Sequence, residues 1–284
     1  MSPWLTVSLA VVFVSFGAVL ARLAAAPALA VSFYRVALAS LLLLPFAARS
    51  AARSFPRLAA RDRALLLASG GFLALHFATW IASLSYTTIA SSVLLVNTAP
   101  LFAIGLSRAF LHERAPRVVL LALPIALTGA ALIAFGDYTG DPGSLRGNLL
   151  ALAGAATVAA YQVIGRGLRN ALPLDAYVLG VWAAAAAVLA FLAGGAGVAL
   201  TGFPARTWLA FAALAVVPTI GGHGLVNKSL RSLPAPTVGL FLLGEPLGAA
   251  VLAFALLGET PGPWTLVGGA FVLAALVLVV VRRG

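Results

Sequence analysis

Long apolar runs, separated by short segments that carry most of the basic residues, constrain this chain more than any other feature. Of its 284 residues, 62% are hydrophobic and only 9% are charged, which is too little polar surface for a soluble domain. A helix of about 20 apolar residues crosses a bilayer, and lipid offers no partner for the open backbone groups of other structures. The sequence therefore predicts an all-α integral membrane protein with ten spans, near residues 3–22, 28–48, 64–86, 90–110, 117–136, 144–165, 176–199, 206–227, 235–257 and 264–281.

The positions of the 18 Lys and Arg residues predict how these spans are oriented. They outnumber the 7 acidic residues, but they lie between the apolar runs rather than along one face, which argues against a nucleic-acid partner. With a cytoplasmic N-terminus, all of them except Arg22, Arg35, Arg146 and Arg206 fall in cytoplasmic segments. Because basic residues gather on that side, we expect a multi-pass protein of the bacterial inner membrane with both termini inside.

An internal repeat divides the chain. "PLFAIGLSRAFLHE" (100–113) and "PLGAAVLAFALLGE" (246–259) lie 146 residues apart and share a proline and a glutamate at the same spacing. The halves are then residues 1–137 and 147–284, with five spans each. Since five is odd, the second half must enter the membrane upside down, which predicts two inverted five-helix repeats around a central cavity.

These segments, together with "FYRVALAS" (33–40) and the run from 245 to 279, resemble the EamA-type repeat of the drug/metabolite transporter superfamily. The resemblance covers nearly the whole chain, once in each half. It implies a ten-helix carrier of small metabolites with a cavity between the halves, most similar to bacterial amino-acid exporters, including the aromatic type. The second half departs from the pattern at one point, because the repeat offset places Val181 where the first half has Arg35.

Several kinds of chemistry are disfavoured by the residues present. The chain has no cysteine, so thiol catalysis and iron–sulfur sites are excluded. "GLVNKS" (224–229) lacks the second glycine and the preceding strand of a phosphate-binding loop, and no second histidine follows Glu113 as "HExxH" requires. We therefore expect no cofactor, no metal and no enzymatic activity, and we expect transport that is gradient-driven or facilitated.

Polar side chains inside the spans are the candidate substrate contacts, because burial in a membrane requires a partner or water. His76 and Trp80 share one face of the third span, and His223 and Asn227 share one face of the eighth. The two spans are repeat equivalents, so both faces are predicted to line the cavity. Alternatively, His76 bonds a carbonyl while Trp80 packs on lipid, and the second pair serves as an interfacial anchor or gate.

Three further residues belong to the candidate substrate set. Asn97 precedes Pro100, and this proline frees the carbonyl of Val96, so Asn97 either satisfies that carbonyl or faces the cavity. Tyr161, in the sixth span, and Trp182, in the seventh, are alternatively residues of the interfacial aromatic belt.

Arg35 and Glu245 are the charged residues that lie away from the ends of the spans, and both have two interpretations. Arg35 either extends to the headgroups or holds a substrate carboxylate. Glu245 lies near mid-membrane beside Pro246, which like Pro100 is expected to break its helix. It serves either in helix packing at "GEPLG" (244–248), a small-residue pattern that permits close approach, or in coupling, by exchanging a proton or meeting a substrate amine.

Together these features predict a monomeric secondary transporter that exports small metabolites, with amino acids, aromatic or otherwise apolar, as the favoured substrates. Its expected partners are the small-molecule substrate and membrane lipid, with no nucleic acid. The alternatives are an exporter of drugs or other metabolites with the same fold, a lipid flippase, or an integral-membrane transferase.

Overall fold

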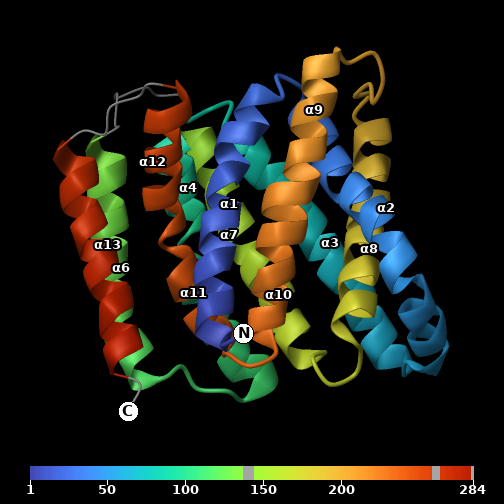
Figure 1. Ribbon diagram of the computed structural model, residues 1–284, viewed down its shortest axis with the longest axis horizontal. Coiled ribbons are helices and arrows are strands. Elements are labelled where there is room, and N and C mark those ends of the chain that lie inside the picture. The colour runs from blue at the N-terminus through green and yellow to red at the C-terminus, as the bar shows by residue number, and fades with distance from the viewer. Residues whose placement is uncertain (88, 137–143, 258–262, 283–284) are drawn as a thin grey trace.

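A computed structural model describes residues 1–87, 89–136, 144–257 and 263–282, and every regular element within them is a helix (Figure 1). In chain order these are α1 (Pro3–Leu23), α2 (Ala28–Ser54), η1 (Phe55–Arg57), α3 (Ala60–Ser83), α4 (Ile89–Val96), α5 (Ala99–Leu106), η2 (Ser107–Leu111), α6 (Arg117–Gly136), α7 (Ser144–Gly167), α8 (Leu174–Gly195), α9 (Ala205–Leu214), η3 (Ala215–His223), α10 (Gly224–Leu230), α11 (Ala235–Leu242), α12 (Glu245–Leu257) and α13 (Pro263–Val281).

The outer surface and the helix lengths are those of a membrane protein. Seven of the described helical segments are long and apolar enough to cross a membrane, and shorter apolar helices span Ala99–Leu111, Arg117–Gly129 and Leu266–Val279. Large apolar side chains face outward, as at Phe46 and Phe191, each 80% exposed, which suits lipid rather than water. The predicted all-helical membrane fold is confirmed, whereas ten crossings with inverted halves stay a prediction.

Prolines mark the beginning of several helices. α2, α8, α9 and α11 each begin immediately after a proline, namely Pro27, Pro173, Pro204 and Pro234. The ring fixes φ and supplies no N–H, so proline suits the residues around a helix start and stops an upstream helix from continuing. The first two of these prolines are 146 residues apart, which is the offset of the sequence repeat.

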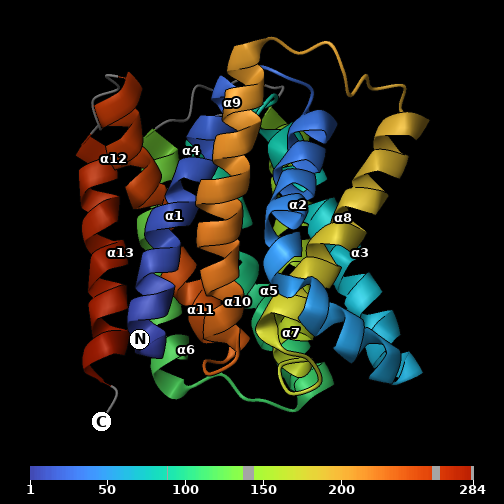
Figure 2. The ribbon, with the colours of Figure 1, turned by 45° about the vertical axis from the view of Figure 1, so that its right-hand side comes forward.

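The helices form one bundle in which segments far apart in sequence are neighbours. α6 lies against α13 (Figure 1), and α2 lies against α8 (Figure 2), so two of the pairs that the repeat offset relates are in contact. α3 packs on α7, and α1 packs on η3, α10 and α12. α1, α3 and α7 consequently surround the middle of the bundle together with the broken segments α4–α5 and α11–α12.

Glycines allow α12 to lie close to α1. A Cβ atom added at Gly248 would lie 2.7 Å from the Cβ of Ser15, and one added at Gly244 would lie 3.1 Å from a methyl group of Val11. The Ser15 hydroxyl also donates to the backbone carbonyl of Glu245 at 3.4 Å. The close helix approach predicted from "GEPLG" is thus confirmed.

Charged side chains join three helix ends at the face where α1 begins and α13 ends, which we call the termini face (Figure 1). Arg166, at the end of α7, donates through Nε to both carboxylate oxygens of Glu113 at 3.2 Å. Its Nη1 donates to the carbonyls of Leu230 and Arg231 at 3.0 and 3.1 Å. Arg169 adds a second ion pair with Glu113 at 3.7 Å. The ends of η2, α7 and α10 are therefore held together at this face. Glu259, which the repeat pairs with Glu113, lies outside the described residues.

The α1–α12 contact predicts that one added methyl group destabilises the fold. Gly248→Ala places its methyl group on Ser15, and we expect a lower melting temperature of the purified protein, equivalent to about 1–3 kcal/mol of overpacking. The matched control is Gly71→Ala, where an added Cβ meets nothing within 4 Å. Equal melting temperatures of the two variants would contradict the close contact.

The predicted topology can be tested with single cysteines, because the natural chain has none. Thr201→Cys lies in the segment between α8 and α9, and Ala52→Cys lies near the end of α2; both positions are exposed. We expect a membrane-impermeant maleimide to label the first variant in intact cells and the second only after permeabilisation. Labelling of both from the same side would overturn the predicted orientation.

Candidate functional site

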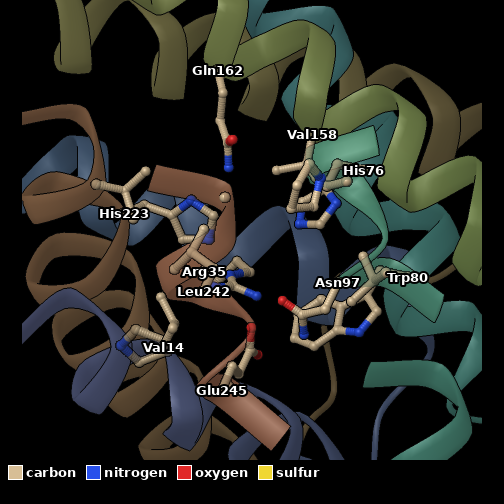
Figure 3. A pocket seen from close by; sticks show the side chains of 17 residues that line it. Val14, Arg35, His76, Trp80, Asn97, Val158, Gln162, His223, Leu242 and Glu245 are labelled. Atoms are coloured by element: carbon tan, nitrogen blue, oxygen red, sulfur yellow. The ribbon is translucent and has the colours of Figure 1, made fainter. Parts of the chain in front are cut away.

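A small cavity of about 50 Å³ lies in the middle of the bundle, where α1, α3, α7 and η3 meet the broken helices (Figure 3). Its polar lining consists of Arg35, His76, Trp80, Asn97, Gln162, His223 and Glu245. Since roughly 10–15 Å³ of such space holds one water molecule, and sites for small molecules usually enclose about 300–1,000 Å³, the cavity is contracted in this conformation. A bound solute larger than a few atoms requires its walls to move apart.

Both broken helices have their breaks at this cavity. α4 ends at Val96 and α5 begins at Ala99, while α11 ends at Leu242 and α12 begins at Glu245. Pro100 and Pro246 are each the second residue of the new helix, but only Pro100 lines the cavity. Irregular backbone at membrane depth is tolerated where it faces a cavity or protein rather than lipid.

Asn97 occupies the first break, and its amide bonds a different carbonyl from the one expected. Its Nδ2 donates to the carbonyl of Val93 at 2.8 Å, not to that of Val96. The side chain also lines the cavity, as does that of Glu245. Asn97 therefore satisfies the helix break and faces the cavity at the same time.

Arg35 is buried in the centre of the bundle. The guanidinium carbon lies 3.8 Å from the centroid of the Phe77 ring and 5.9 Å from that of Trp80, a geometry in which the ring faces attract the cation. Only 1% of the residue is exposed. The interpretation in which Arg35 extends to the headgroups is therefore wrong, because α2 turns this side chain inward onto α3.

The Arg35 guanidinium is anchored by a hydroxyl from η3. Its Nε donates to Thr219 Oγ1 at 3.2 Å, and that hydroxyl donates to the carbonyl of Leu214 at 2.8 Å. η3 is a π-helix that contains Pro218, and such widened turns occur often at functional sites. In contrast, Nη1 of Arg35 is buried without a hydrogen-bond partner.

His76 and Trp80 form one stacked pair on α3, with ring centroids 5.8 Å apart and planes at 6°. His76 Nδ1 lies 3.0 Å from the carbonyl of Gly154, so this nitrogen carries a proton. The Trp80 ring fits beside Gly17 and its Cβ beside Gly154, and its Nε1 has no partner. Trp80 is 4% exposed, so its packing on lipid is excluded, whereas the carbonyl bond of His76 coexists with its place in the cavity wall.

His223 and Asn227, the second predicted pair, differ in whether they line the cavity. His223 lines the cavity, and its ring centroid lies 6.2 Å from that of His76. Asn227 lies one turn further along, donates to the His223 carbonyl at 2.8 Å and to the hydroxyl of Tyr161, and does not line the cavity. Tyr161 and Trp182 are likewise buried without lining it. These two side chains thus lie in the protein interior rather than in an interfacial belt.

Glu245 lies in the first turn of α12, where the helix dipole favours a negative charge. Its carboxylate interacts electrostatically with Arg35, but no ion pair joins these two side chains, both of which are among the described residues. Figure 3 shows Asn97, Arg35 and Glu245 around one side of the cavity, with His223 and Gln162 on the other.

Four contributors to the site are missing from the predicted set. Gln162 is 1% exposed and lines the cavity, although its neighbour Tyr161 was the predicted contact. Val158 lies four residues before Gln162 on α7 and also lines it, so the spacing of these two residues is the signal that could have found this face. Phe77 and Thr219, which hold Arg35, carried no comparable signal.

The cavity combines hydrogen-bond donors, acceptors and both signs of charge within an apolar wall. Within the described ranges, no three His, Cys, Asp or Glu side chains are grouped as a metal site would require. The lining groups are suited to binding a polar solute by charge and hydrogen bonds.

Known proteins resemble the chain in sequence over both halves. Residues 1–135 and 145–281 each match the EamA-like transporter family. An uncharacterized transporter of Archaeoglobus fulgidus is 29% identical over 256 residues, which cover 88% of this chain and 86% of that protein. A probable terminal-alkyne amino-acid exporter of Streptantibioticus cattleyicolor is 28% identical over 191 residues, covering 66% and 62% of the two chains.

A solved structure shares the arrangement of the helices. One crystal structure superimposes with a TM-score of 0.76 over 99% of this chain and 96% of its own, at 17% sequence identity. At that identity the likeness concerns the fold alone.

The anchoring of Arg35 predicts that Thr219→Val destabilises the protein. Valine keeps the shape of threonine but leaves the guanidinium Nε without its acceptor, which costs about 1–3 kcal/mol for a buried donor. Thr219→Ser retains a hydroxyl and is the matched control. We expect the melting temperature in detergent to fall for valine and to stay near that of the natural protein for serine; a valine variant as stable as the serine variant would show that the hydroxyl does not hold Arg35.

Proposed function

We propose that this chain, which belongs to the EamA-like transporter family, is a secondary transporter that carries small amphipathic solutes out of the cell, with amino acids as its substrates. Its place would be the bacterial inner membrane, with the termini face in the cytoplasm and the solute moving through the central cavity.

The observation that carries this proposal is the polar cavity in the middle of the bundle. Its lining comes from both sequence halves, since α1, α2 and α3 supply Gly17, Arg35 and His76 while α7 and α12 supply Gln162 and Glu245. Transporters built from repeats place their substrates near mid-membrane between the halves, beside broken helices. Motion of one half against the other would then expose this cavity to either side in turn.

Amino acids are favoured over other solutes by the charges of the lining. A phosphorylated sugar usually requires several Arg or Lys side chains around its phosphate, and Arg35 is the one such residue in this wall. An amino acid needs only a site for each of its two charges. One relative is named a probable terminal-alkyne amino-acid exporter, and this name supports amino acids as the substrate class. No specific observation favours a drug exporter, a flippase or a transferase.

The test is counterflow in liposomes that contain the purified protein, with a panel of radiolabelled amino acids. Trp80 forms one wall of the cavity and stacks on His76, so we expect Trp80→Ala to lower the exchange of the best substrate at least about tenfold, equivalent to roughly 1.4 kcal/mol, while the protein still folds.

The matched control is Phe191→Ala, which removes an aromatic side chain from the lipid-facing surface of α8, where it is 80% exposed. This variant should exchange amino acids at the natural rate. If the natural protein exchanges no amino acid but scrambles lipid, the proposed function is wrong; if Trp80→Ala exchanges as fast as the control, the solute passes elsewhere.

A further inference from the structure

We infer that the central cavity recognises the two opposite charges of a zwitterion, with Arg35 and Trp80 donating to the carboxylate and Glu245 accepting from the ammonium group. This inference rests on the proposed function and narrows its substrate class to free α-amino acids with apolar side chains. It assigns a separate role to each charged residue of the lining.

The first observation is that two opposite charges face one cavity without joining. Arg35 and Glu245 interact electrostatically, yet the ion pairs formed by the described part of the chain are those of Glu113 with Arg166 and Arg169. Phe77 and Thr219 hold the guanidinium on one side, while Glu245 projects from the first turn of α12 on the other. The protein therefore fixes the separation of its two charges.

The second observation is a set of unpartnered polar atoms in side chains of the same lining. Nη1 of Arg35 and Nε1 of Trp80 are buried donors without an acceptor, in residues that are 1% and 4% exposed. A buried donor that lacks a partner costs free energy, so a ligand that supplies acceptor oxygens to both is favoured. A carboxylate has two oxygens and suits this pair of donors.

The third observation is the balance of charge. Of the side chains that line the cavity, Arg35 and Glu245 are the two that are charged in their ordinary state at neutral pH. A ligand with a net positive or negative charge would leave one of them uncompensated in an apolar wall, which is costly. A zwitterion compensates both, so the pair selects against amines and against simple carboxylic acids.

The rest of the wall defines the side chain of the ligand. Val14, Pro100, Val158, Val226 and Leu242 line the cavity with apolar surface. Polar or charged substituents would lose their hydration there without gaining a partner. Because the cavity in this conformation holds only a few atoms, it is sized for the charged end of an amino acid, and the apolar side chain needs the space that opens when the walls separate.

The experiment compares ligands that share one apolar side chain and differ only in charge. Exchange of radiolabelled L-leucine is measured in liposomes containing the purified full chain, with L-leucine, L-leucinamide or 4-methylpentanoate as competitor. Leucinamide lacks the carboxylate, and 4-methylpentanoate lacks the ammonium group. For the natural protein we expect leucine to compete at least about tenfold better than either analogue, because each analogue leaves one buried charge unpaired.

Two variants assign the charges to their residues. Arg35→Gln should lose most of its discrimination against leucinamide and keep that against 4-methylpentanoate, whereas Glu245→Gln should show the opposite pattern. Arg206→Gln, at an exposed position at the start of α9, and Asp175→Asn, which still accepts from Ser50, are charge-removing controls that should keep both preferences. If Arg35→Gln does not fold, Arg35→Lys retains the positive charge and should retain the preference for leucine over its amide.

The outcomes separate this inference from the proposed function. If no amino acid of the panel is exchanged, the proposed function fails. If leucine is exchanged but its amide and its deaminated analogue compete equally well with the natural protein, transport stands and recognition of the zwitterion is refuted. The same refutation follows if either glutamine variant alters both preferences alike.

Discussion

A guanidinium at the centre of an apolar bundle is the constraint on which the middle of this structure depends. Without partners, a charge at that depth costs several kcal/mol. Phe77 offers a ring face, Thr219 an acceptor, and Glu245 an opposite charge at a distance. Each comes from a different helix, so the burial of Arg35 requires α2, α3, η3 and α12 to meet. The unusual backbone of η3 and the broken start of α12 are both located where this compensation is made.

Much of the fold could be predicted from the sequence, because membrane helices are specified by runs of about 20 apolar residues and by proline. The apolar runs correspond to helices, and α5 and α12 each begin one residue before a proline, Pro100 and Pro246, which suits the first turn of a helix. The shared face of His76 and Trp80 followed from a spacing of four residues. These features are local, and local physics is sufficient to determine them.

The orientation of individual side chains could not be predicted in the same way. Arg35 is close enough to the end of its predicted span for its side chain to reach the headgroups. The rotation of α2 about its own axis turns this side chain inward instead, and that rotation depends on all the helices packed against α2. On α7, one residue, or about 100° of rotation, separates Gln162 in the cavity wall from Tyr161 behind it. Asn227, one turn after His223, does not line the cavity, and its amide donates to the hydroxyl of Tyr161. Such distinctions require the packed neighbours to be known.

The glycine contacts around α1 have a consequence for motion. α1 meets α12 at Gly244 and Gly248, and it meets η3 at Gly221 and Gly222. Where the side chains of one helix interlock with the grooves of another, the two helices can slide past each other only if those side chains change rotamer or the helices move apart. The glycine faces of residues 244–248 and of η3 present no ridge to α1, so α1 can shift along them while most side chains keep their conformations. Small sliding movements of packed helices are one established way in which proteins change shape, and the glycine faces packed on α1 are suited to such shear.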